Sequence, residues 1–129
     1  MHTLFWLYLI NSILLINHEI DSAYWKEWEL FKLPGGINGF LIIHFPLLFF
    51  VLYGLVLVNE GTFAGLIFSL VLSGSGLFAF GIHSFFIQKG HRQFTTPISR
   101  LILTATLITS ILQGGLTIYL LMTHGSSPA

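Results

Sequence analysis

Four apolar stretches, each long enough to cross a lipid bilayer, constrain this chain more than any other feature of its sequence. A membrane-spanning helix needs about 20 mainly apolar residues. Four segments meet that length, namely 4–23, 37–58, 63–87 and 98–122. Only 8% of the 129 residues are charged, whereas soluble domains carry about 25%. The sequence therefore predicts an all-α integral membrane protein that contacts membrane lipids directly.

The connections between these stretches are short, and short connections favour antiparallel neighbouring helices. We therefore expect one domain over residues 1–129, folded as an up-down four-helix bundle. The first helix should continue as an amphipathic interfacial segment over residues 24–32, because Tyr, Trp and Lys together mark the lipid headgroup level. The run Leu33-Pro34-Gly35-Gly36 then ends that helix.

The distribution of charge predicts the orientation of the bundle. All five basic residues lie in or beside the connections after the first and third spans: Lys26, Lys32, Lys89, Arg92 and Arg100. By the positive-inside rule these connections are cytoplasmic and both termini lie outside. The formal net charge is zero and no basic arm is present, so nucleic acid is not expected as a partner.

Three histidines on three different spans are predicted to lie at one depth. With about 1.5 Å of rise per residue, His18 and His44 each lie roughly 12 Å from the cytoplasmic interface, and His83 lies roughly 9 Å from it. Asp21 follows His18 by one helical turn on the same face. We therefore predict a buried polar site formed by His18, Asp21, His44 and His83.

The residue types in this site suit a divalent metal such as zinc or non-haem iron, because imidazole and carboxylate are common ligands of both. An open coordination position would activate water or oxygen, and an apolar small-molecule substrate would enter from the bilayer. Glu19 is then the candidate catalytic residue, as a general base or as an orienter of a ligand. Glu27 and Glu29 are expected to be surface charges.

Several other interpretations stay open at the level of sequence. The histidines would also suit a network of hydrogen bonds between helices, with Asp21 oriented by His44 or Arg100. Haem b bracketed by His44 and His83 is a further alternative. A buried histidine–carboxylate pair also occurs in proton- or cation-coupled transporters. Finally, a small chain with apolar faces suits a homo-oligomer or an accessory subunit of a larger membrane complex.

One part of the sequence resembles a known family. It consists of His18-Glu19-Ile20-Asp21-Ser22-Ala23-Tyr24-Trp25-Lys26, followed by Leu33-Pro34-Gly35-Gly36 and His44. It resembles a family of small bacterial four-span membrane proteins of unknown function. The His-Glu-Ile-Asp part is also loosely similar to membrane proteins named for a His-x-x-Glu-Glu motif. The resemblance implies a bacterial inner-membrane location but no reaction.

Overall fold

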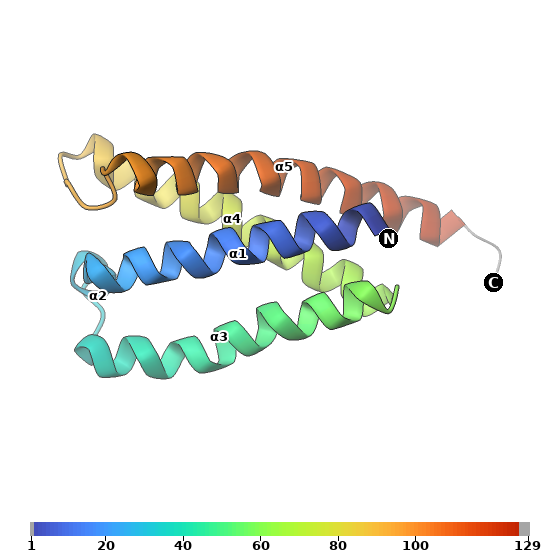
Figure 1. Ribbon diagram of the computed structural model, residues 1–129, viewed down its shortest axis with the longest axis horizontal. Coiled ribbons are helices and arrows are strands. Elements are labelled where there is room, and N and C mark those ends of the chain that lie inside the picture. The colour runs from blue at the N-terminus through green and yellow to red at the C-terminus, as the bar shows by residue number, and fades with distance from the viewer. Residues whose placement is uncertain (1, 127–129) are drawn as a thin grey trace.

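The fold is an all-α bundle of four long helices and one short helical turn, as the sequence predicts. The computed structural model describes residues 2–126. Its helices are α1 (His2–Tyr24), α2 (Glu27–Leu30), α3 (Gly36–Asn59), α4 (Phe63–Gln88) and α5 (Pro97–Ser126). The four long helices are all long and apolar enough to cross a membrane. They run side by side, with the start of α1 and the end of α5 at the same end of the bundle (Figure 1).

The first helix ends earlier than predicted, and this break shapes the site described below. Lys26 adopts a left-handed conformation with φ of 53°, which a continuous α-helix does not allow. Its N–H donates to the Ala23 carbonyl at 3.3 Å, and its own carbonyl accepts from Glu29 N–H at 2.8 Å. The chain therefore changes direction, and the expected interfacial extension becomes the separate turn α2 instead.

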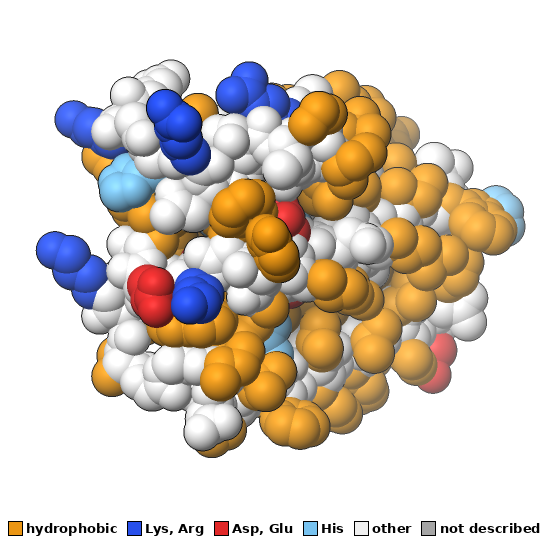
Figure 2. Space-filling view, turned by 60° about the vertical axis from the view of Figure 1, so that its left-hand side comes forward, with side chains coloured by type: hydrophobic (Ala, Val, Ile, Leu, Met, Phe, Trp, Pro, Cys, Tyr) orange, Lys and Arg blue, Asp and Glu red, His pale blue; other side chains and the backbone are white. Residues whose placement is uncertain are grey.

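All five basic side chains lie at the end of the bundle that carries α2 and the α4–α5 connection, and we call it the basic end. Figure 2 shows Lys and Arg gathered there, beside a surface that is otherwise mainly apolar. The helical faces that surround the bundle expose large apolar side chains, among them Phe45, Phe49 and Ile108. Such an apolar exterior is compatible with lipid and not with water.

A buried polar network joins α1, α4 and α5 in the half of the bundle away from the basic end. The Asn11 amide donates to Ser110 Oγ at 3.1 Å and to Gln113 Oε1 at 2.9 Å. The Gln113 amide in turn donates to the Ser69 carbonyl and to Ser69 Oγ. Interhelical hydrogen bonds of this kind hold helices together in lipid, where apolar burial gives little driving force.

Helices α3 and α4 lie closest at the end away from α2, where Gly65 packs on the backbone of α3. A Cβ at Gly65 would lie 2.6 Å from the Leu57 carbonyl oxygen, so the contact is between backbones. The Phe50 and Phe68 rings stack at 4.2 Å a little further along. Towards the basic end the two helices diverge (Figure 1). This divergence leaves room for a cavity between them.

Candidate metal centre

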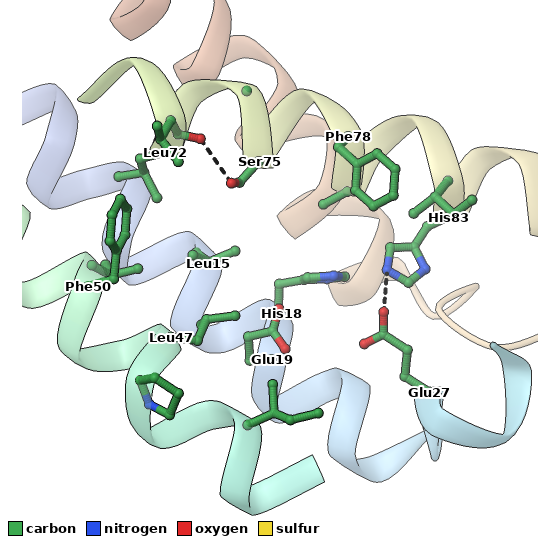
Figure 3. A pocket seen from close by; sticks show the side chains of 17 residues that line it. Leu15, His18, Glu19, Glu27, Leu47, Phe50, Leu72, Ser75, Phe78 and His83 are labelled. Atoms are coloured by element: carbon green, nitrogen blue, oxygen red, sulfur yellow. Dashed lines mark hydrogen bonds and ion pairs between the residues drawn. The ribbon is translucent and has the colours of Figure 1, made fainter. Parts of the chain in front are cut away.

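His18, Glu27 and His83 come together at the basic end of the bundle, from α1, α2 and α4. One potential ligand atom of each residue lies within 4.8 Å of the others, so the group could hold a metal ion. Figure 3 shows the two imidazoles and the Glu27 carboxylate pointing towards one another. The turn at Lys26 is what carries the Glu27 carboxylate back towards the bundle interior.

The spacing of these donors is close to that of a zinc site. His83 Nε2 lies 3.5 Å from Glu27 Oε1, and the His18 and His83 ring centroids are 4.6 Å apart. A tetrahedral zinc with ligands at about 2.0–2.2 Å separates its donor atoms by about 3.4 Å. The His83–Glu27 pair already has about this separation, and a ring nitrogen of His18 lies within 4.8 Å of a ligand atom of each.

The environment of both imidazoles also fits a metal. His18 is 3% exposed and His83 is 1% exposed, yet the Nδ1 atom of each ring is buried without a hydrogen-bond partner. A metal bound between His83 Nε2 and Glu27 would not supply a partner for His83 Nδ1, so the metal assignment depends on the burial of the rings and on the donor types. Two imidazoles and one carboxylate are a common protein ligand set for zinc, with a fourth position left open.

Glu27 is suited to act as the anionic ligand. Burial by itself raises the pKa of its carboxyl, but the adjoining His83, together with the smaller effects of Ser22 and then His18, outweighs this and holds the pKa below its ordinary 4.5. Glu27 is therefore ionised at neutral pH. Its side chain is 14% exposed, so the expectation that it is a surface charge is wrong.

Two phenylalanines enclose the histidines. The Phe94 ring lies 4.2 Å from His83 and 5.6 Å from His18, measured between centroids. Phe31 also stacks on His83, with 6.1 Å between the ring centroids. Phe94 belongs to the connection between α4 and α5, and it folds back from that loop to shield the site. Such a dry site strengthens the interaction between a metal and its charged ligand.

Of the four ligands predicted from the sequence, the structure brings His18 and His83 together and places the other two in different contacts. Asp21 Oδ1 accepts a hydrogen bond from Trp25 Nε1 at 2.9 Å, one turn along the chain. His44 Nε2 lies 2.5 Å from Glu19 Oε2, and His44 Nδ1 lies 2.6 Å from the Phe40 carbonyl. Both ring nitrogens of His44 are thus in contact with other protein groups.

The Glu19–His44 pair forms a second polar group beside the metal centre, and its Glu19 side chain lines the same cavity. Because a carbonyl only accepts, His44 Nδ1 carries a proton in its contact with Phe40. The contact between His44 Nε2 and Glu19 then requires one further proton, held by either the imidazole or the carboxyl. The pair is therefore neutral overall, and it holds one exchangeable proton.

An elongated cavity of about 850 Å³ connects these polar groups with the space between α3 and α4. His18, Glu19, Glu27 and His83 lie towards the basic end of this cavity (Figure 3). The rest of its wall is mainly apolar and comes from α1, α3 and α4, including Leu15, Leu47, Phe50, Leu72, Phe78 and Ile82. Residues of α5 do not take part in this wall.

Glu27, Phe31 and Phe94 are the contributors that sequence reasoning missed. The histidines were identified because an ionisable residue inside an apolar span stands out. Glu27 lies among other charges beyond the span, and Lys26 carries no signal for the left-handed turn that redirects it. Phe94 lies in a polar loop, and its isolated aromatic ring between Gln93 and Thr95 is the one available hint of burial.

Comparison with known proteins places the chain in a family without assigning it a reaction. No curated protein and no solved structure matches it. A family model does match, and it covers residues 4–120, which include all of α3 and α4, most of α1 and α5, and every residue of the candidate metal centre. The chain therefore belongs to the family of unknown function DUF6713.

Proposed function

We propose that this protein is an integral membrane protein that binds a divalent metal, zinc or iron, through His18, Glu27 and His83, and that the metal activates water next to a cavity open to the bilayer. The observation that carries the proposal is the convergence of two almost fully buried imidazoles and one ionised carboxylate from three separate helices.

An open metal position gives this site a chemical role beyond structure. A metal-bound water loses its proton far more readily than bulk water. A bound metal would supply an activated water at this position. Glu19 faces the same cavity and would take up the proton of that water, and His44, in contact with Glu19 Oε2, would orient the carboxylate. Glu19 thus has the role of general base in this proposal.

Metal analysis of the untagged, full-length protein tests the proposal. We expect one zinc or iron per chain in the wild type, and loss of most of it in Glu27→Gln, because the amide removes the anionic ligand. Glu29→Gln is the matched control, since Glu29 lies in the same turn but is exposed. A metal-free wild type that stays metal-free after incubation with excess zinc would overturn the proposal. So would equal metal content in the two variants.

A further inference from the structure

The cavity beside the metal centre has the form of a site for one hydrocarbon chain. It follows α4 from Val71 to His83, a length of about 18 Å at about 1.5 Å per residue. This is more than half of the roughly 30 Å thickness of the hydrocarbon core of a bilayer. Its volume of about 850 Å³ lies within the range of about 300–1,000 Å³ that is usual for small-molecule sites.

The cavity is open sideways and closed at its far end. Ile43 of α3 and Phe78 of α4 line it and are both exposed on the outside of the bundle, so its mouth faces the acyl chains of the membrane. The stacked rings of Phe50 and Phe68 bridge α3 and α4 at the opposite end from the metal centre. A chain that enters from the bilayer therefore lies with one end at His18, Glu27 and His83.

The charge of the metal centre indicates which kind of head group belongs at that end. Two neutral imidazoles and one carboxylate leave a divalent ion with a net charge of about one positive unit. An anionic oxygen donor would complete the coordination and neutralise the site.

We propose that the cavity binds a long-chain fatty carboxylate, with its hydrocarbon chain between α3 and α4 and its carboxylate on the open metal position. The inference rests on the proposed metal site and names the ligand class that this site accepts. The fatty carboxylate enters the cavity sideways from the bilayer, so it does not have to pass through water. Without the metal, Glu27 repels the carboxylate, and binding depends on the metal for that reason.

Gly74 offers a way to fill the cavity without disturbing the metal ligands. It lines the cavity, and a Cβ built on it meets nothing within 4 Å. Ser75 also lines the cavity and provides a second position for a large side chain. Gly81 is the matched control, because a Cβ there also meets nothing within 4 Å and the residue is not part of the cavity wall.

The experiment measures binding of radiolabelled palmitate to the full chain in nanodiscs, together with zinc content in the same samples. We expect one palmitate per zinc-loaded chain, and affinity lower by about tenfold or more after chelation. Gly74→Phe and Ser75→Phe should lower the affinity by about tenfold or more and retain zinc, whereas Gly81→Phe should retain both ligands.

The outcomes separate this inference from the metal site itself. Normal zinc content with no palmitate binding, or with equal binding in Gly74→Phe and the wild type, would overturn the inference and leave the metal site intact. Equal binding of the uncharged long-chain alcohol and palmitate would overturn the assignment of the carboxylate to the metal. A wild type that binds no zinc would overturn the metal site and, with it, this inference.

Discussion

Phe94 combines a buried aromatic ring with a backbone conformation that bulky residues rarely adopt. Its ring is 1% exposed, and its φ of 65° lies in the left-handed region. Such strain persists only where the surrounding structure determines the conformation, and it concentrates at functional sites. Here the shielding of His18 and His83 by the ring accounts for the conformation.

We expect Phe94→Ala to lower the free energy of unfolding by about 3–5 kcal/mol, the usual cost of removing a buried phenylalanine ring. The comparison is Phe45→Ala, where the side chain is 79% exposed to the surroundings of the bundle. That variant should change stability by less than about 1 kcal/mol. Reversible unfolding in detergent, monitored by circular dichroism, measures both. Similar values for the two variants would show that the Phe94 ring does not pack on the histidines.

Glu19 and His44 form a pair whose coupling can be measured directly. Their 2.5 Å contact predicts that Glu19→Gln and His44→Ala are non-additive, with a coupling energy of about 0.5–3 kcal/mol. Asp21→Asn provides the comparison, because the Asp21 carboxylate bonds to Trp25 and shares no partner with His44. Two double-mutant cycles of unfolding free energies test this. The cycle of Glu19→Gln with His44→Ala should show coupling, and the cycle of Asp21→Asn with His44→Ala should be additive within about 0.5 kcal/mol. The reverse pattern would contradict the pairing.

At the scale of helices, Gly54 decides how closely α1 approaches α3. A Cβ at this position would lie 2.0 Å from the hydroxyl oxygen of Tyr8, and that hydroxyl donates to the Val51 carbonyl at 2.8 Å. The absence of a side chain at Gly54 thus lets a buried tyrosine bond to the backbone of α3. This contact lies in the apolar core that joins Leu4, Leu15, Val58 and Leu66.

Gly54→Ala should therefore displace Tyr8 and destabilise the protein by about 1–3 kcal/mol, as overpacking usually does. Gly115→Ala is the control, because a Cβ on Gly115 of α5 meets nothing within 4 Å. That change should be neutral or slightly stabilising, since alanine favours helix more than glycine does. Unfolding midpoints in the same detergent compare the two. A neutral effect of Gly54→Ala would contradict the close packing of α1 on α3.

The helices themselves could be predicted from the sequence, whereas the relative rotation of their faces could not. The apolar character of a membrane span extends over its whole length and can be read from the sequence. The predicted segment 37–58 therefore agrees with α3 to within one residue at each end. Pro97 also begins α5, as its rigid φ suggests. Depth along a helix places His44 level with His18, but a rotation of α3 decides that His44 meets Glu19 instead. The rotation of a helix about its axis depends on its contacts with the other helices, and a local sequence pattern does not predict these contacts.

The same distinction applies to the candidate site. His18 and His83 could be selected because charged and polar groups are rare within the spans. Glu27 could not, because its position depends on the left-handed Lys26 and on contacts of α2 with the ends of α1 and α3. A straight continuation of α1 would carry Glu27 away from the bundle. Glu27, the third residue of the candidate metal centre, thus depends on a break in the helix that the sequence pattern does not predict.

At the scale of the whole molecule, the gathering of all basic residues at one end predicts the orientation in the membrane. The positive-inside rule places the basic end in the cytoplasm. The chain contains no cysteine, so single cysteines can be introduced without other changes. In intact cells, a membrane-impermeant maleimide should label Glu60→Cys, in the α3–α4 turn, and should label His91→Cys only after permeabilisation. Labelling of His91→Cys alone in intact cells would reverse the orientation.

The most direct measurement of the central claim is the visible absorption of the cobalt(II)-substituted protein, because these bands report the ligands and coordination number of the metal. We predict the intense bands of a four-coordinate site in the wild type and in His44→Ala, since His44 belongs to the neighbouring pair with Glu19. The bands should collapse in His83→Ala, where a buried ligand of the proposed centre is lost. Bands that survive in His83→Ala and disappear in His44→Ala would contradict the assignment of the metal to His18, Glu27 and His83.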